Sequence, residues 1–473
     1  MIGIVRPRSS IAVVGTGIAG LGAAWLLDPE HDVTLLEADS RLGGHSNTVT
    51  LPLSDGEAQV DTGFIVYNHR NYPLFSTLLE HLRVETHATD MSFGLSVDEG
   101  RFEFGSMGLN GLLAQRTNLL SPRFYRLLTE ILRFNRCARR LAASDPGDTR
   151  TVAMTLGAFL VRQRFSPILR DRYLLPMAAA IWSCPLQQML DFPAFSLARF
   201  FDNHGLLDLR GRPRWRSVIG GSRRYVQRLA AGLSRPPLLD ARVRSVTHLR
   251  SRPCTRVGGG DGTRAGWRLT LADGRNLEFD AVVLAVHADQ AARMLEVGPQ
   301  RDLLSRISYQ PNRVVLHQDP RLMPRRRAAW SSWNYLSQDD GLVDGRVDVV
   351  RRAPTVTYWM NNLQRLDTRQ NLFVSLNPSV EPRHVLYQTH YEHPVFDESA
   401  HAAQRALQPL QGERGLWLCG SYHGHGFHED AFRSACAVAA GFGVQPRLEL
   451  PEQSIPWLSA RDDLSTGPTR VAA

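Results

Sequence analysis

The chain has 473 residues, too many for one ordinary core and enough for two domains around a large cofactor. The formal net charge is +9, but the arginines are scattered and form no basic arm, so we expect no nucleic-acid partner. The same charge favours peripheral contact with an anionic membrane surface. The sequence contains no lysine, which excludes Schiff-base chemistry, a P-loop lysine and a lysine general base.

The five cysteines are widely spaced, and no pair has C-x-x-C spacing. We therefore expect neither a disulfide framework nor a metal site, and a reducing cytoplasm as the compartment. The apolar run from Ile11 to Leu27 follows two arginines and imitates a signal peptide or a short membrane helix. Its four glycines and the polar strand pattern after it argue against both interpretations.

The first forty residues predict a strand, a tight turn, a helix and a second strand. Ile11 to Val14 and Asp32 to Leu36 have the short apolar pattern of buried strands, and Leu21 to Leu27 that of a helix. Residues 106 to 175 are expected to be rich in helix, with clear helical spacing from Phe124 to Leu141.

The later part of the chain predicts sheets. Residues 266–279 have the pattern of a β-hairpin, and 280–286 that of a central parallel strand. Aromatic and β-branched residues between about 300 and 400 favour a mostly antiparallel sheet. A strand over 416–418 precedes a glycine-rich turn and a helix over 431–440, and the tail from 446 to 473 is expected to be loose.

The motif Gly15-Thr16-Gly17-Ile18-Ala19-Gly20 stands between the predicted strand and helix. Its glycines allow a sharp turn, close approach of a pyrophosphate, and tight packing of the helix, whose first N–H groups face the phosphates. Glu37 ends the second strand, where a carboxylate can accept the ribose hydroxyls of an adenosine. This context predicts a dinucleotide site.

The choice between NAD and FAD rests on the segment after Glu37. Ala38 is followed by an acid, Arg41 and the pair Gly43-Gly44 before His45, which suits a loop passing under a pyrophosphate toward a flavin ring. A second glycine turn at Gly420 precedes a helix near the C-terminus and suits the ribityl chain. FAD is therefore the predicted cofactor.

These features resemble the flavin amine-oxidase superfamily, which includes phytoene desaturases and protoporphyrinogen oxidases. A closer resemblance is to the FAD-containing oxidoreductase domain of plant cyclopropane-fatty-acid synthases and to related free-standing bacterial flavoproteins. It covers about residues 10 to 440 and rests on blocks in chain order: Asp61-Thr62-Gly63-Phe64-Ile65-Val66-Tyr67-Asn68, Ile181-Trp182-Ser183-Cys184-Pro185, Gly211-Arg212-Pro213-Arg214-Trp215, Trp330-Ser331-Ser332-Trp333-Asn334 and Gly424-His425-Gly426-Phe427-His428-Glu429-Asp430.

The resemblance implies an α/β fold: a Rossmann-like FAD-binding domain from residues 1–85, 210–295 and 405–445, with an interleaved α+β substrate domain from 86–209 and 296–404. Fingerprint and resemblance together predict the following cofactor-binding residues: Gly15, Gly17, Ile18, Ala19, Gly20, Glu37, Ala38, Arg41, Gly43, Gly44, His45, Gly63, Phe64, Val243, His287, Gly420, Ser421, Phe427 and His428. Ser421 stands where the superfamily has an acid.

The candidates for proton transfer are Tyr422, His425 and His428, which follow the turn expected to face the flavin. The alternatives are a hydrogen-bonding wall of the cofactor site or, for the H-x-H-x-x-H pattern, a metal site. Glu429 and Asp430 are interpreted as caps of a helix rather than as a catalytic pair. Aromatics such as Trp182, Trp333, Tyr335, Tyr358 and Trp359 suit either an apolar substrate cavity or ordinary core packing.

The resemblance implies an FAD-dependent oxidoreductase that dehydrogenates an aliphatic chain of a methylated or cyclopropane fatty-acyl lipid by hydride transfer to flavin N5. It also implies a lipid methyltransferase as partner, and peripheral contact with the inner face of the membrane. The alternatives are an amine or porphyrinogen oxidase and a non-catalytic, flavin-containing subunit of the methyltransferase. The missing lysine disfavours amine oxidation.

Overall fold

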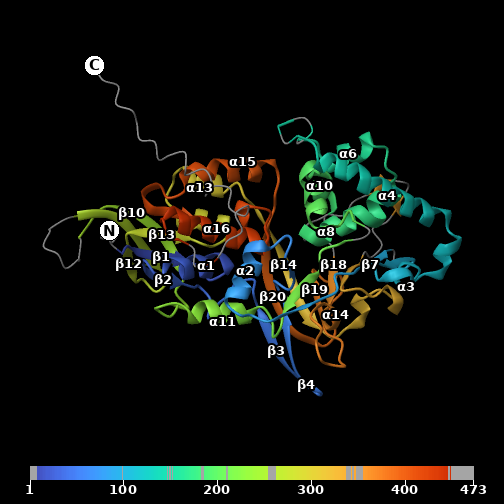
Figure 1. The fold of residues 1–473 in the computed structure, drawn as a ribbon, viewed down its shortest axis with the longest axis horizontal. Helices are drawn as coiled ribbons and strands as arrows, with labels where there is room; N and C mark the ends of the chain where they lie inside the picture. Colours follow the sequence, from blue (N-terminus) through green and yellow to red (C-terminus); the bar gives the residue numbers. More distant parts are fainter. Residues whose placement is uncertain are drawn as a thin grey trace.

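The computed structural model describes residues 8–97, 100–145, 147–148, 151, 153–182, 186–208, 211–253, 263–336, 342–343, 346–347, 355–445 and 448. Figure 1 shows an elongated molecule with the first strands and last helices at one end and the helices of the middle of the chain at the other. Among the described residues, no helix is both long enough and apolar enough to cross a bilayer.

The first sheet is parallel and has the order β2 (Asp32–Leu36), β1 (Ser10–Val14), β13 (Ala281–Leu284), β21 (Leu416–Leu418). The fully buried run Ile11–Val13 explains why β1 lies inside the sheet. Helices α1 (Ile18–Leu27) and α16 (His428–Gly441) pack against each other beside it. The predicted strand, turn and helix over Ile11 to Leu27 are thus confirmed, and β13 is central as predicted.

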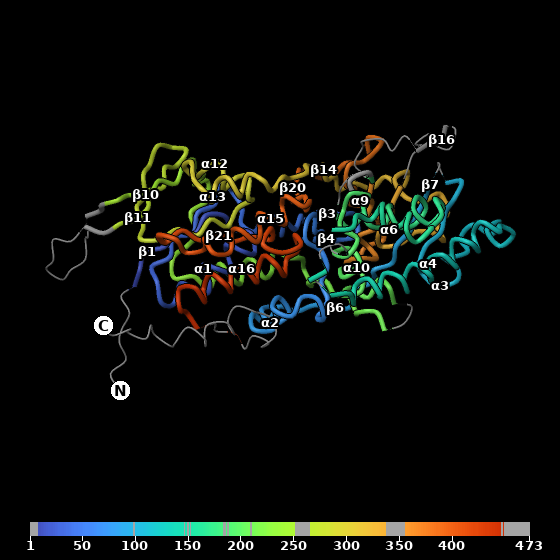
Figure 2. The backbone as a smooth tube through the Cα atoms, turned by 90° about the horizontal axis from the view of Figure 1, so that it is seen from above, coloured from blue at the N-terminus to red at the C-terminus, as the bar shows by residue number. Residues whose placement is uncertain are grey.

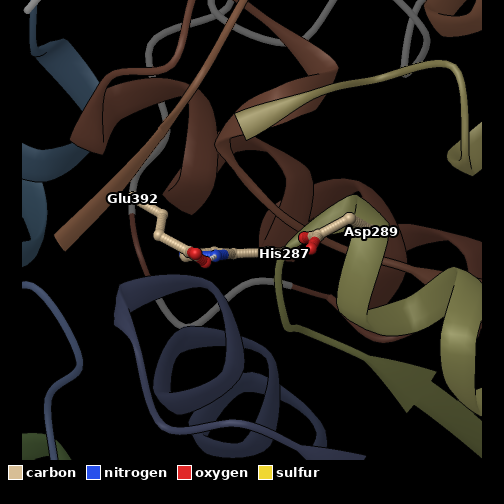
Figure 3. Close-up of side chains that lie close together, drawn as sticks. All are labelled: His287, Asp289 and Glu392. Carbon is tan, nitrogen blue, oxygen red and sulfur yellow. Dashed lines mark hydrogen bonds and ion pairs between the residues drawn. The ribbon is translucent and has the colours of Figure 1, made fainter. Parts of the chain in front are cut away.

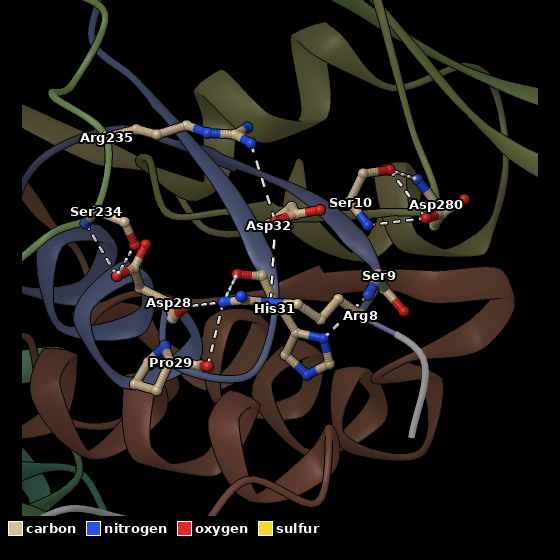
Figure 4. A network of polar contacts seen from close by, with 10 residues as sticks. All are labelled: Arg8, Ser9, Ser10, Asp28, Pro29, His31, Asp32, Ser234, Arg235 and Asp280. Atoms are coloured by element: carbon tan, nitrogen blue, oxygen red, sulfur yellow. Dashed lines mark hydrogen bonds and ion pairs between the residues drawn. The ribbon is translucent and has the colours of Figure 1, made fainter. Parts of the chain in front are cut away.

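Polar contacts fix the edges of this sheet around the start of β1 (Figure 4). The carboxylate of Asp280 accepts from the backbone N–H of Ser10 at 2.8 Å, which holds the start of β13 beside β1. The carboxylate of Asp28, at the end of α1, accepts from the N–H of Ser234 at 3.0 Å. These contacts tie the start of β1 to β13 and the end of α1 to the segment at Ser234.

A second sheet confirms the predicted hairpin. It is antiparallel, in the order β10 (Val243–Pro253), β11 (Thr263–Leu271), β12 (Asn276–Phe279). Residues 254–262, between β10 and β11, lie outside the described part. Besides α1 and α16, the half of the molecule that contains the parallel sheet includes α2 (Pro73–His81), α11 (Arg223–Ala231), α12 (Ala288–Met294), α13 (Pro299–Leu304) and α15 (Glu398–Leu407).

The third sheet has seven strands, in the order β20 (Val385–Pro394), β14 (Tyr309–His317), β19 (Phe373–Leu376), β18 (Thr355–Trp359), β15 (Trp333–Leu336), β7 (Phe93–Val97), β8 (Phe102–Gly105). All its pairs are antiparallel except β15 with β7. This confirms the mostly antiparallel sheet predicted between residues 300 and 400.

Helices cover one side of this sheet at the far end of the molecule (Figures 1 and 2). They are α3 (Gly108–Leu112), α4 (Pro122–Ala142), α6 (Leu156–Arg162), α7 (Pro167–Leu169), α8 (Leu175–Trp182), α9 (Leu186–Asp191) and α10 (Ala194–Asn203). The long helix α4 includes the predicted span Phe124 to Leu141. Phe134 and Phe201 are buried in the cluster that these helices share with β7 and β8.

Shorter elements complete the described part of the fold. They are the hairpin β3 (Thr48–Leu53) with β4 (Gly56–Asp61), the small sheet of β5 (Tyr67–Asn68), β9 (Trp215–Val218) and β6 (Thr86–Ala88), the pair β16 (Leu342–Val343) with β17 (Arg346–Val347), and α14 (Met360–Leu363). The parallel sheet takes its strands from the three segments predicted for FAD binding, and the seven-stranded sheet from the two intervening segments. The boundaries of that division stay a prediction, and the tail predicted to be loose lies outside the described residues apart from Leu448.

Candidate functional site

A cavity of about 900 Å³ runs from the end of β1 to the helices of the far end. The candidate proton-transfer residues Tyr422, His425 and His428 line it. So do all the residues predicted to bind the cofactor except Gly20, which is buried behind Gly15. The structure thus brings together residues from both ends of the chain, while their contact with FAD stays a prediction.

The three glycines of the first turn differ in the space that an added Cβ would find. Gly15 has φ +99°, and a Cβ there would lie 2.6 Å from the carbonyl oxygen of Ala285. A Cβ on Gly20 would lie 1.8 Å from the carbonyl oxygen of Gly15, so this glycine lets α1 pack closely on the strand. A Cβ on Gly17 would meet nothing within 4 Å. Open space at Gly17 is what a phosphate lying against the backbone requires.

The start of α1 offers N–H groups to the cavity. Gly17 is the N-cap residue and supplies no side-chain acceptor, and Ile18 and Ala19 line the cavity after it. The first N–H groups of a helix have no acceptor within the helix and attract anions. This end of the cavity therefore suits a pyrophosphate.

Glu37 supports the turn as well as facing the cavity. Its carboxylate accepts from the backbone N–H of Thr16 at 2.9 Å, from the Thr16 hydroxyl, and from the N–H of Asp39 at 3.0 Å. Val243 on β10 lines the cavity nearby, as expected for an adenosine pocket. The contact of Glu37 with ribose hydroxyls stays a prediction, and its oxygens keep lone pairs for such a contact.

The Gly43-Gly44 loop passes directly under the start of α1. Both glycines have positive φ, +105° and +53°, and a Cβ on Gly44 would lie 3.3 Å from Cα of Gly17. A Cβ on Gly63 would lie 2.1 Å from the carbonyl oxygen of His45. The segment around Gly63 is therefore in close backbone contact with His45, which leaves no room for a side chain at Gly63.

The two acids that open α16 cap two different helices. Asp430 accepts from the N–H groups of His425 and Phe427 at 2.9 and 3.1 Å and so caps its own helix, as predicted. Glu429 instead accepts from the N–H groups of Leu74 and Phe75 at 2.9 and 3.0 Å, at the start of α2. Both acids therefore act as helix caps, as interpreted from the sequence, and the helix that Glu429 caps is α2 rather than its own. Burial raises the pKa of Glu429 to about 7.

His428 is held as part of the cavity wall. Its Nε2 lies 2.6 Å from the Tyr225 hydroxyl and 3.2 Å from Oγ of Ser46, and its ring stacks on Phe64 at 3.7 Å. Burial lowers the pKa of His428 to about 3, so the ring is neutral at physiological pH. These contacts favour the wall interpretation over proton transfer by His428.

The other candidates of this segment differ in accessibility. His425 is exposed on the cavity side. The Tyr422 hydroxyl is buried and has no hydrogen-bond partner among the described residues, and burial raises its pKa well above the ordinary value. His423 does not line the cavity; its Nε2 lies 3.3 Å from Nε2 of Gln411. The H-x-H-x-x-H pattern therefore forms no cluster of metal ligands among the described residues.

His287 lies in a polar group on the cavity wall (Figure 3). Its Nδ1 is 3.4 Å from the carboxylate of Glu392, its ring stacks on Tyr309, and the Asp289 carboxylate approaches from α12. These three side chains could hold a metal ion by proximity, but Asp289 already forms an ion pair with Arg293 at 2.8 Å. We interpret the group as a polar wall of the cofactor site.

The far half of the cavity is apolar. The described residues that line it from α8, α10, β7, β9, β15, β18 and the segments beside them include no Asp, Glu or Arg. They include Phe93, Met177, Ile181, Trp182, Phe200, Leu206, Trp215, Trp333 and Tyr358. Of the aromatics singled out from the sequence, Trp182, Trp333 and Tyr358 line the cavity. Tyr335 and Trp359 pack elsewhere, Tyr335 in the helical core and Trp359 against Trp330.

No sequence motif pointed to His204, the basic side chain in this apolar half. It follows α10, lines the cavity, and lies against Phe200 and Phe427 with centroid distances of 3.8 and 5.9 Å. Its Nδ1 lies 2.9 Å from the carbonyl oxygen of Phe200, which can only accept, so Nδ1 carries the hydrogen. Burial lowers the pKa of His204 to about 4. The neutral ring therefore keeps a lone pair on Nε2.

Two features show whether these residues fit FAD: the open space beside the backbone and the N–H groups that have no acceptor within the helix. The open side of Gly17 and the first N–H groups of α1 face one cavity. Arg41 lines the same part and offers a positive charge to phosphate. The residues present fit a dinucleotide with a polar ring system, so the fold and site define a flavin-dependent oxidoreductase.

Comparison with known proteins gives the family. The model of the flavin containing amine oxidoreductase family matches residues 18–441, and the chain belongs to this family. It is an FAD-dependent oxidoreductase, and its cofactor is FAD. A search of curated proteins found no match.

Solved structures share the fold at low identity. A fatty acid isomerase from P. acnes that produces CLA is 15% identical with a TM-score of 0.61, covering 92% of this chain and 98% of that one. A putrescine oxidase mutant with redesigned cofactor binding is 18% identical with a TM-score of 0.64 over 92% and 99% of the two chains. A putative protoporphyrinogen oxidase from Exiguobacterium sp. 255-15 is 16% identical with a TM-score of 0.61 over 92% and 99%. At these identities the likeness shows the fold.

Proposed function

We propose that this flavoprotein dehydrogenates an aliphatic chain of a fatty-acyl lipid, with a methylated or cyclopropane-bearing chain as the preferred substrate. The observation that carries the proposal is the apolar half of the cavity, where the described lining includes no Asp, Glu or Arg. An ammonium substrate would find no carboxylate among this described lining to pair with, and burying a charge without an ion pair is costly. Three acids line the cavity elsewhere. Glu37 and Asp39 lie just after β2, and Glu392 lies on β20.

The chain's own groups divide the work between the two halves. The start of α1, Glu37 and Arg41 would hold the phosphates and the adenosine, and bound FAD supplies a hydride acceptor at N5. Trp182, Phe200 and the other apolar side chains would orient a hydrocarbon chain and exclude water.

Dehydrogenation removes a hydride from one carbon and a proton from its neighbour. The proton needs an acceptor, and Nε2 of His204 has a lone pair on the wall of the apolar half. We assign His204 as the proton acceptor because it lines the apolar half, whereas Tyr422 is buried with a raised pKa and His428 is already bonded to Tyr225. His425, which is exposed on the cavity side, stays the alternative predicted from the sequence. One of the similar structures is a fatty acid isomerase, which agrees with an acyl chain in this fold.

The test is anaerobic reduction of the flavin. Purified holoprotein is mixed with cyclopropane-bearing phospholipid, with the unmodified phospholipid and with putrescine, and the absorbance of the flavin is followed. We expect bleaching with the modified lipid. Bleaching by the amine alone would refute the proposal, and no bleaching with any lipid, together with capture of a lipid methyltransferase, would favour an accessory subunit.

A pair of variants tests whether the apolar half is the substrate site. Ile181→Asp places a charge in the cavity lining, whereas Val297→Asp places one at a position that is 84% exposed. We expect Ile181→Asp to abolish reduction by lipid while FAD is retained, and Val297→Asp to reduce normally. Equal rates in the two variants would contradict this use of the cavity.

A further inference from the structure

Large apolar side chains stand exposed on α3, on the 3₁₀ helix η1 (Arg116–Leu120) and along α4. Leu109 and Leu120 are 77% and 88% exposed, far more than a leucine of a packed surface. The exposed apolar side chains of this region are Met107, Leu109, Leu119, Leu120, Tyr125 and Leu132. Figures 1 and 2 both place α3 and α4 at the end of the molecule opposite β10 and β11. We call this surface the α3–α4 face.

The exposed apolar side chains of α4 do not lie on the side of the helix that faces the core. That side is already covered, because Phe124, Leu127 and Phe134 are buried among the neighbouring helices and strands. Tyr125 and Leu132 therefore form a second apolar feature on the outer side of the same helix. Apolar side chains gathered on an outer surface mark a site of interaction.

The exposed charged side chains of residues 100–142, which include α3, η1 and α4, all have one sign. Between residues 100 and 142 the sequence has two acids, Glu103 and Glu130, and both are buried and bonded inward. Glu103 accepts from the N–H groups of Arg325 and Arg326, and Glu130 from the N–H of Ser166. Exposed arginines without an ion pair to a described acid remain on the outside: Arg101, Arg116, Arg123, Arg136 and Arg140.

Exposed leucines among these arginines match the boundary of an anionic bilayer. The leucines can enter the acyl region to a shallow depth, while the guanidinium groups lie at the level of the phosphates. We propose that the α3–α4 face docks this protein onto the surface of a membrane containing anionic phospholipid. The inference rests on this surface alone and holds whatever reaction the cavity supports.

Vesicle co-sedimentation of the holoprotein tests the docking. The vesicles contain phosphatidylcholine alone or phosphatidylcholine with phosphatidylglycerol. We expect sedimentation with the anionic vesicles, little with the neutral ones, and release as added salt screens the charges. Each arginine near the surface contributes about fivefold to the partition coefficient, so the variant Arg116→Gln/Arg123→Gln/Arg136→Gln should bind about a hundredfold less.

A matched control variant removes three arginine charges from a surface away from the α3–α4 face. Arg301, Arg306 and Arg405 are exposed on and beside α13 and α15, helices that pack in the same core cluster as strands β1 and β13. Their triple change to Gln should leave vesicle binding almost intact. Leu109→Ser/Leu120→Ser should weaken binding with every arginine in place, and flavin content and melting temperature show that each variant is folded.

Three results would overturn the proposal. The first is equal recovery of the wild type with anionic vesicles and without vesicles. The second is an equal loss of binding in the two arginine variants. The third is self-association in solution that the Leu109→Ser/Leu120→Ser change abolishes, since the face would then join two copies of the chain.

Discussion

A glutamate at position 17 provides the sharpest test of where FAD lies. Gly17 is the N-cap of α1, with φ −60° and ψ 175°, which any residue can adopt, and its Cβ would meet no atom within 4 Å. The folded chain should therefore accept Gly17→Glu without strain. The side chain would point into the cavity where the helix start faces the phosphates.

The cost to the cofactor follows from this geometry. A carboxylate about 4 Å from one phosphate charge costs about 4 kcal/mol at an effective dielectric constant of 20. That energy lowers the affinity for FAD by roughly a thousandfold, since about 1.4 kcal/mol corresponds to a factor of ten. Gly17→Gln has the same bulk without the charge, so the difference between the two variants isolates the electrostatic part.

The assay is the FAD content of the purified variants, followed by titration of the apoproteins with FAD. Gly17→Glu should be colourless yet melt cooperatively, and Gly17→Gln should bind FAD measurably better. A Gly17→Glu protein that is isolated with stoichiometric FAD would refute the placement of the pyrophosphate at the start of α1.

Further predictions concern the packing, the ribose, the buried acid and the proposed base. Gly20→Ala should lower the free energy of unfolding by about 1–3 kcal/mol or more, because its Cβ would lie 1.8 Å from the Gly15 oxygen; an unchanged denaturation midpoint in the apoprotein would contradict this. Glu37→Ala should weaken FAD binding by about 1.5–3 kcal/mol, measured by titration, and unchanged retention of FAD would count against its ribose role. The folded pKa of Glu429 is raised from its ordinary value to about 7, so its own contribution to stability is complete below pH 4.5 and falls by about 3 kcal/mol as the pH rises to 7. Buried histidines such as His204 and His428, whose pKa values are lowered to about 4 and about 3, contribute the opposite slope over this range, so the test is the difference between the wild type and Glu429→Gln. That difference should change by about 3 kcal/mol between pH 4.5 and 7, and two stability curves of the same shape would refute the assignment. His204→Phe should keep FAD and slow its reduction by lipid about 10²- to 10⁴-fold, as expected for loss of a general base, and stopped-flow reduction at the normal rate would exclude that role.

The local part of the site could be predicted because its signals are close together in sequence. Strand β1, the glycine turn, α1 and β2 occupy fewer than forty residues. Gly15 and Gly20 answer steric demands of their neighbours, and Gly17 leaves open space at the start of α1. Glu37 ends β2 and reaches back to Thr16, so its place at the cavity also follows from the strand order.

Contacts between distant segments could not be predicted in this way. Glu429 caps α2 through the N–H of Leu74, which is 355 residues away along the chain. His204 belongs to no motif and gains its orientation from the carbonyl of Phe200 and from Phe427, which only the packing of α10 on the start of α16 brings near. Tyr335 and Trp359 show the converse, since their aromatic pattern fits a cavity but Tyr335 packs into the helical core and Trp359 packs against Trp330.

Lipid analysis of cells with and without this chain tests the proposed reaction most directly. The account predicts that cells lacking the chain accumulate methylated or cyclopropane acyl chains and lose a species with two fewer hydrogen atoms. Restoring the wild type should restore that species, whereas His204→Phe should restore it poorly. An unchanged acyl-lipid profile, with an amine or a porphyrinogen accumulating instead, would contradict the account.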